Sequence, residues 1–112
     1  SHYEKKQYIE AFEVLDSGLK KYPYNAQMYY YRALVFDALN RNAAAIVDLQ
    51  KSIELDPSYY MSYYQLGLIY EKIYDEKSAL VAYERFLSME PDDKDLAKEV
   101  QNKVISLGKK YY

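Results

Sequence analysis

Side chains that could carry out acid–base or metal chemistry are few in this 112-residue sequence and form no recognisable constellation. His2 is the only histidine, and at the second position a tag remnant or a disordered residue is expected there rather than a catalytic base or metal ligand. The grouped carboxylates follow patterns typical of solvated helix faces and caps. They are Glu10, Glu13, Asp16, Asp92, Asp93 and Asp95. We therefore expect no catalytic residues and no enzymatic activity.

Cofactor and metal sites are equally unsupported by the residue types. The sequence has no cysteine, which excludes disulfides and thiolate metal ligands. Its glycines, Gly18, Gly67 and Gly108, are isolated and cannot form a phosphate-binding loop. We expect neither a cofactor nor a metal.

Charge and hydropathy limit the partner classes. The net charge of -2 and the pI near 5.4 argue against nucleic-acid binding, although Lys20, Lys21, Lys109 and Lys110 could form a local basic patch. No run approaches the roughly 18 apolar residues of a membrane span. We expect a soluble protein without membrane insertion. Its compartment stays open, with the cytoplasm as the default and export as the alternative.

A proline repeat dominates the organisation of the chain. Pro23, Pro57 and Pro91 recur at equal intervals, and each ends a similar apolar and polar phrase. A period between roughly 20 and 50 residues is typical of stacked supersecondary units, in which each unit covers the apolar face of its neighbour. The spacing of the prolines falls in this range and predicts a repeat array.

Each unit is predicted to contain two helices and a tight turn. Between Asn25, a helix-capping residue, and Pro57, the apolar periodicity predicts helices over residues 26–39 and about 43–55. The same plan recurs after Pro57. We predict one domain over residues 1–112, with these parts: a partial first repeat at 3–24, a second repeat at 25–57, a third at 58–91 and a C-terminal capping helix at 92–108.

The third unit combines large aromatic, small and proline residues at set spacings: Tyr63, Leu66, Gly67, Tyr70, Ala79, Tyr83 and Pro91. With these residues the sequence resembles the tetratricopeptide repeat family, whose pattern has such residue types at the same spacings. The second unit departs at Arg32, where the family usually has leucine; Arg32 is expected either to reach Asp16 or to lie at a groove rim. The resemblance implies an all-α fold, a right-handed superhelical array of helix-turn-helix repeats (an α-solenoid).

Small residues are expected where helices approach closely, at Ala33, Ala45, Gly67 and Ala79. The 16 tyrosines recur at helical spacings, so most are expected in the core rather than on a base-stacking surface.

The resemblance also implies that the first helix of each repeat lines a concave groove that binds a partner. The predicted groove residues are Gln27, Tyr30, Leu34, Asp37, Met61, Tyr64, Leu68, Glu71 and Lys72. They predict a non-catalytic protein-interaction module for a peptide or helix segment with an apolar anchor. For Tyr30 and Tyr64, bracing of neighbouring helices is an equal alternative. The basic residues with which one branch of the family holds acidic chaperone tails are missing, apart from Lys72.

Two other functions remain open. A homo-oligomer could form through the incomplete N-terminal repeat, if Phe12, Leu15 and Leu19 lack cover within the chain. The chain could also be the targeting segment of a larger enzyme, since such arrays are often attached to catalytic domains in this family.

Overall fold

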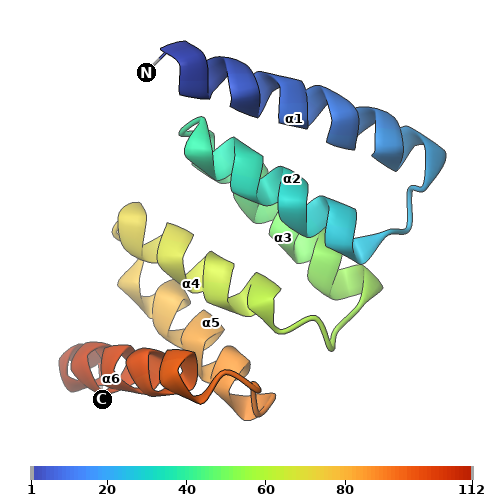
Figure 1. The fold of residues 1–112 in the computed structure, drawn as a ribbon. Helices are drawn as coiled ribbons and strands as arrows, with labels where there is room; N and C mark the ends of the chain where they lie inside the picture. Colours follow the sequence, from blue (N-terminus) through green and yellow to red (C-terminus); the bar gives the residue numbers. More distant parts are fainter. Residues whose placement is uncertain (1, 112) are drawn as a thin grey trace. The chain divides into compact units, whose positions relative to one another are not determined.

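The computed structural model describes residues 2–111, and this part of the chain is entirely helical apart from its turns (Figure 1). The helices are α1 (His2–Lys21), α2 (Ala26–Ala38), α3 (Asn42–Leu55), α4 (Met61–Lys72), α5 (Glu76–Ser88) and α6 (Lys94–Tyr111). The prediction of an all-α fold is confirmed. Within residues 2–111 no helix combines the length and the apolar character needed to cross a membrane.

Side chains at the turns set several helix boundaries. Asn25 caps α2 as predicted, because its Oδ1 accepts a hydrogen bond from the Met28 N–H at 2.9 Å. Asp75 caps α5 by accepting from the Ser78 N–H at 3.3 Å. Each bond satisfies one of the amide groups that a helix start leaves without a partner.

The last helix is longer than predicted. α6 continues through Gly108 to Tyr111, so the expected end at residue 108 was wrong. Contacts with Glu76 at the start of α5 hold this last turn: the carboxylate accepts hydrogen bonds from Lys110 Nζ at 2.9 Å and from the Tyr111 hydroxyl at 3.2 Å. The hydrogen bond from Lys110 is the main reason why the pKa of Glu76 lies below its usual range.

The chain divides into two compact units, with the boundary between Ser62 and Tyr63. In the first unit α2 packs against both α1 and α3. Ala33, Ala45 and Leu49 are fully buried there. A buried hydrogen bond of 2.9 Å joins the hydroxyls of Ser52 and Ser62, so α3 and the start of α4 are linked by a satisfied polar pair.

The second unit contains the rest of α4 together with α5 and α6. Its largest fully buried side chains are Tyr83 and Phe86 of α5, with Val100 of α6 also fully buried. Gly67 of α4 faces Tyr83, since a methyl group added at Gly67 would come within 2.2 Å of the phenol ring. The small residue predicted at this position is therefore required by the ring opposite.

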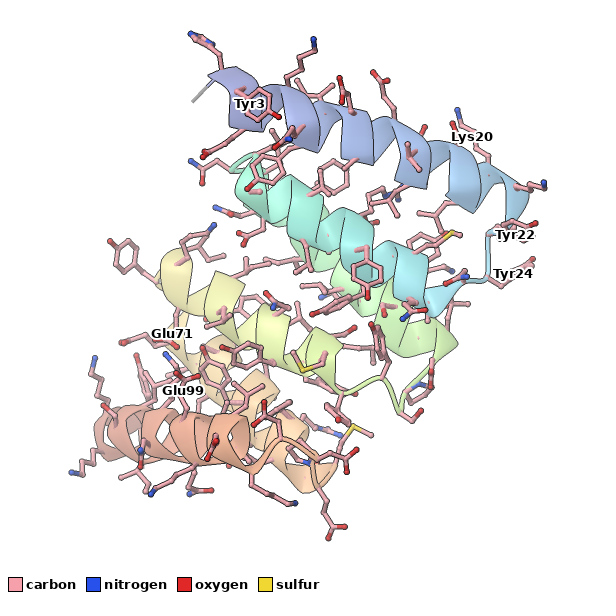
Figure 2. The ribbon with its side chains drawn as sticks, viewed as in Figure 1. Tyr3, Lys20, Tyr22, Tyr24, Glu71 and Glu99 are labelled. Atoms are coloured by element: carbon pink, nitrogen blue, oxygen red, sulfur yellow. The ribbon has the colours of Figure 1, made fainter. Side chains whose placement is uncertain are left out.

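Most tyrosines are not in the core, contrary to the sequence-based expectation. Among the tyrosines of residues 2–111, only Tyr30 and Tyr83 are buried. Tyr3, Tyr22 and Tyr24 are well exposed and project from α1 and from the turn that follows it (Figure 2). Helical spacing places a residue on a face, but burial also requires a neighbour that covers that face.

Tyr74 in the turn between α4 and α5 has a left-handed backbone, with φ of 64°, and is 90% exposed. Replacing Tyr74 by Asn, the residue that adopts the same conformation at Asn40, is expected to raise the free energy of unfolding by about 0.5–1 kcal/mol, because asparagine tolerates this region better. Urea denaturation measures the change.

A matched control is Tyr24→Asn, which alters a tyrosine that is 81% exposed and has no left-handed backbone. This variant is expected to stay near wild type. Equal effects of the two substitutions would show that backbone strain at Tyr74 does not limit stability.

Candidate functional site

An ion-pair cluster joins the three helices of the first unit. Arg32 of α2 donates to both carboxylate oxygens of Asp48 on α3, from Nε at 2.7 Å and from a terminal nitrogen at 2.8 Å. It also pairs with Asp16 of α1 at 3.2 Å. The hydrogen bond to Asp48 raises the pKa of Arg32 above its usual value. The predicted pairing with Asp16 is confirmed, while Asp48, whose side chain is 5% exposed, is the stronger partner and was missed.

A comparison of the two repeats contains the signal that Asp48 is a partner of Arg32. A shift by one repeat carries Arg32 onto Leu66 and Asp48 onto Ala82, so one charged pair stands where the next repeat has two apolar residues. Opposite charges that replace an apolar pair at matched positions indicate a buried ion pair. We assign the Arg32 cluster to structure, because its three members satisfy one another.

On α2, the predicted groove residues differ in accessibility. Gln27 is exposed, whereas Leu34 and Asp37 are half-buried. Tyr30 is 7% exposed, and its ring lies 5.0 Å from the ring of Tyr59. Tyr30 therefore braces the unit, as in the structural alternative.

On α4, Lys72 is exposed, while Met61 and Leu68 are half-buried. The Tyr64 ring lies 5.6 Å from that of Phe86 on α5, and its hydroxyl approaches Glu99 of α6 at 3.5 Å. Tyr64 is thus held by two neighbouring helices, which restricts its freedom to contact a partner.

Glu71, another predicted groove residue, belongs to a polar cluster inside the second unit (Figure 2). Its carboxylate accepts hydrogen bonds from the Tyr83 hydroxyl and, at 3.2 Å, from Lys103 Nζ of α6. Burial, assisted by this bond to Glu71, raises the pKa of Tyr83 far above that of a free phenol. The hydroxyl stays protonated and donates, so Glu71 links α4, α5 and α6.

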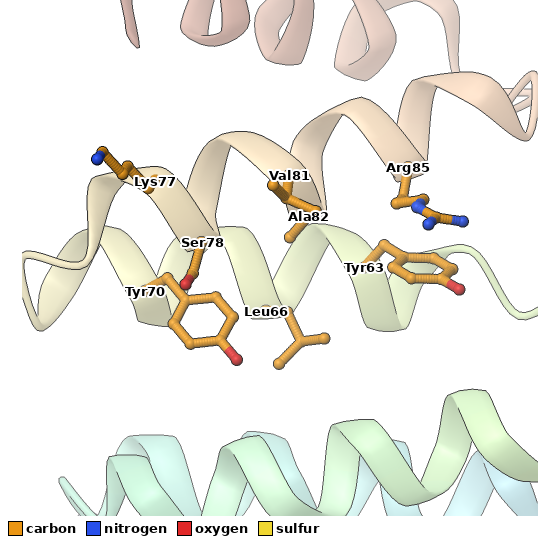
Figure 3. A pocket seen from close by; sticks show the side chains of 8 residues that line it. All are labelled: Tyr63, Leu66, Tyr70, Lys77, Ser78, Val81, Ala82 and Arg85. Atoms are coloured by element: carbon orange, nitrogen blue, oxygen red, sulfur yellow. The ribbon is translucent and has the colours of Figure 1, made fainter. Parts of the chain in front are cut away.

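A pocket of about 520 Å³ lies on the second unit, lined by residues of α4 and α5 (Figure 3). Its lining residues are Tyr63, Leu66, Tyr70, Lys77, Ser78, Val81, Ala82 and Arg85. In Figure 3 the apolar side chains occupy the centre, with Tyr63 and Arg85 at one end and Tyr70 and Lys77 at the other. Leu66 and Ala82 are buried, whereas Val81 is 55% exposed.

Sequence reasoning did not identify this pocket. It assigned Tyr63, Leu66 and Tyr70 to the family pattern and did not consider the outward residues of α5. Lys77, Val81 and Arg85 recur every four residues and therefore share one helix face, which was the available signal. Within residues 2–111 there is no group of three or more histidine or acidic side chains that could hold a metal ion.

The proposed reason for self-association is wrong in its details. Leu19 is buried within the first unit, and the Phe12 ring lies 5.3 Å from that of Phe36 on α2. Exposed aliphatic side chains of α1 are instead Ile9 and Val14, together with the exposed rings of Tyr3 and Tyr8. Phe12 and Leu19 therefore have cover within the first unit, while Leu15 is half-buried, and these residues no longer argue for a homo-oligomer.

Known proteins share the repeat pattern. A profile described as TPR repeat matches residues 36–73, and one described as tetratricopeptide repeat matches residues 62–93. The small glutamine-rich tetratricopeptide repeat-containing protein 2 of Saccharomyces cerevisiae is 32% identical over 88 residues, which are 79% of this chain and 25% of that protein. The Hsp70-Hsp90 organizing protein of Triticum aestivum is 23% identical over 96% of this chain and 18% of its own length. The chain spans about a fifth of the length of these curated relatives.

Solved structures share the fold. The first TPR of Spaghetti (RPAP3), bound to the HSP90 peptide SRMEEVD, is 25% identical with a TM-score of 0.80, and the match covers 96% of this chain and 85% of that one. The Yersinia enterocolitica chaperone SycD, in complex with a peptide of YopD, has a TM-score of 0.88 at 12% identity, over 98% of this chain and 86% of that one. The chain therefore belongs to the tetratricopeptide repeat family and is a helical protein-binding module.

Proposed function

We propose that this chain is a non-catalytic module that binds a peptide or a helical segment of a partner protein through the first helices of its repeats. The contact residues are the accessible members of the predicted groove set: Gln27, Leu34, Asp37, Met61, Leu68 and Lys72. Tyr30, Tyr64 and Glu71 act indirectly, by holding these helices in place.

One observation carries the proposal. Leu34 and Leu68 occupy matched positions of successive repeats. Both are only half-buried, although other apolar residues of the same two helices are buried in the core. Partly accessible leucines that recur in register suit a ligand that runs past successive repeats and inserts apolar side chains. The likeness to the peptide-bound RPAP3 repeat domain supports a peptide as the ligand, without specifying its side chains.

The residue types favour an apolar anchor over an acidic tail. A C-terminal carboxylate is held most strongly by several charged or amide donors that converge on it. Among the nine predicted groove residues only Lys72 is cationic, and Asp37 and Glu71 are acidic. We therefore place the partner among segments with leucine-like or aromatic anchors, with a basic residue near Asp37, and not among the acidic chaperone tails.

The test is selection of binding peptides from a displayed library, followed by affinity measurements on single peptides. Changing Leu34 and Leu68 together to Asp is expected to weaken binding by at least about tenfold, because a carboxylate replaces each apolar contact. Circular dichroism checks that helix content is kept. The control Val47→Asp, at an exposed valine of α3, is expected to bind as wild type. Unchanged affinity of the double variant would rule out these helix faces as the site.

A further inference from the structure

We propose that the pocket between α4 and α5 is a second docking site, which takes an extended segment of a partner protein with two carboxylates that flank one apolar side chain. This site is separate from the proposed groove and does not depend on it. On α4, Leu68 lies about 160° around the helix from Leu66 and from Tyr70, as follows from the turn of about 100° per residue in an α-helix.

The charge of the pocket selects an acidic ligand. Lys77 and Arg85 are its only charged lining residues, although the chain as a whole carries a net charge of -2. Tyr63 and Tyr70 add one phenol hydroxyl at each end, and Ser78 adds a third hydroxyl. Each end therefore offers a cation together with a hydrogen-bond donor, an arrangement that suits a carboxylate.

Three of these donors have no protein partner among residues 2–111, and Lys77 contacts only an aromatic ring. Among residues 2–111 the structure pairs neither the Arg85 guanidinium nor the hydroxyls of Tyr63 and Tyr70 with a protein acceptor. Lys77 Nζ lies 5.4 Å from the centre of the Tyr111 ring, a cation–π contact that supplies no anion. Both ends of the pocket thus keep their capacity to bind a carboxylate.

The centre of the pocket selects an apolar side chain. Leu66 and Ala82 form a buried floor and Val81 an open wall, so a leucine-sized group that entered would remove apolar surface on both sides from water. The volume of about 520 Å³ accommodates such a side chain together with its flanking backbone.

Helix geometry sets the spacing of the ligand. Lys77 and Arg85 are eight residues apart on α5, or about 12 Å along its axis. An extended chain covers that distance in roughly four residues. The preferred segment therefore has two acidic residues separated by three others, of which the middle one is apolar.

The probe is a capped pentapeptide with the sequence glutamate, serine, leucine, serine, glutamate, titrated into the chain by nitrogen-edited proton NMR. We expect resonances of α5 around Val81 to shift. The double variant Lys77→Gln, Arg85→Gln is expected to lose at least about tenfold in affinity, and added salt is expected to weaken the wild-type complex. Val81→Asp is expected to weaken binding further, because it places a carboxylate in the apolar centre.

Three controls separate this site from others. Lys51→Gln changes the cation that stands one repeat before Arg85, and it is expected to bind the peptide as wild type. The Leu34, Leu68 double variant tests the groove independently and is expected to leave this peptide unaffected. A pentapeptide with glutamine in place of both glutamates is expected to bind at least about tenfold more weakly.

Four results would overturn the proposal. They are no binding at millimolar peptide, equal binding of the glutamine peptide, full affinity in the Lys77, Arg85 double variant, and loss of binding in the groove variant. Sedimentation of the chain alone tests whether a second copy of the chain occupies the pocket. Self-association that disappears in the Lys77, Arg85 variant would identify a second copy of the chain as the occupant and would overturn the assignment to a partner segment.

Discussion

Replacing Asp48 by alanine is expected to lower the free energy of unfolding by about 3 kcal/mol, at the lower end of the range for breaking a buried ion pair. The substitution removes both short hydrogen bonds from Arg32 and leaves Asp16, at a longer distance, as the carboxylate paired with the guanidinium. Urea denaturation followed by circular dichroism measures the loss. Asp16→Asn, at a carboxylate with a more exposed side chain, is expected to have an effect below about 1 kcal/mol.

The repeat supplies a rescue for this loss. The double variant Arg32→Leu, Asp48→Ala installs the residues that the next repeat has at these positions, Leu66 and Ala82. It removes the buried charge together with its partner, so it is expected to recover most of the stability lost in Asp48→Ala. If the double variant is no more stable than Asp48→Ala alone, the unpaired Arg32 is not the source of the loss.

Replacing Gly67 by alanine is expected to destabilise the protein by about 2 kcal/mol, although alanine has the higher helix propensity by about 1 kcal/mol. The added methyl group would lie 2.2 Å from the Tyr83 ring. That ring cannot move away at low cost, because it is fully buried and its hydroxyl is bonded to Glu71. Thermal and urea denaturation both report the change.

A double-mutant cycle that uses the residues of the preceding repeat tests whether the Tyr83 ring causes the destabilisation by Gly67→Ala. Ala33 and Leu49 occupy the positions of Gly67 and Tyr83 there, and both are fully buried. Adding Tyr83→Leu to Gly67→Ala is expected to be less destabilising than the sum of the two single changes by about 1–2 kcal/mol, because the smaller side chain makes room for the methyl group. The control Ala33→Gly is expected to destabilise through lost propensity and a small void. A stabilising effect of Gly67→Ala would show that the ring yields.

The helices and the family could be predicted from the sequence because their signals are local and recur. The even proline spacing, the apolar periodicity and Asn25 predicted helices that the structure contains. The far end of α6 could not be predicted in this way. Gly108 is typical of a helix end, but hydrogen bonds from Lys110 and Tyr111 to Glu76 favour continuation, and they join residues about a repeat apart.

The candidate site was predictable only in part. Sequence periodicity grouped Tyr30, Tyr64 and Glu71 with Leu34 and Leu68 on one stripe of each helix, and the family resemblance implied that this stripe lines the groove. The structure shows the first three held by ring contacts and hydrogen bonds within their own units. The pocket beside Val81 depends on how α4 and α5 pack side by side, and no single helix pattern contains that information.

By itself, the sequence determined the repeat length, the helical class and which residues share a helix face, because each depends on spacing along one chain. Tertiary structure decided which faces are covered, which cations have acceptors and which glycine must stay a glycine. Those outcomes depend on atoms brought together from different helices, as in the contacts of Arg32 with Asp48 and of Gly67 with Tyr83. In a buried contact, an unpaired charge or a single extra methyl group is costly at distances of a few ångströms. The residue types along the chain do not specify such distances.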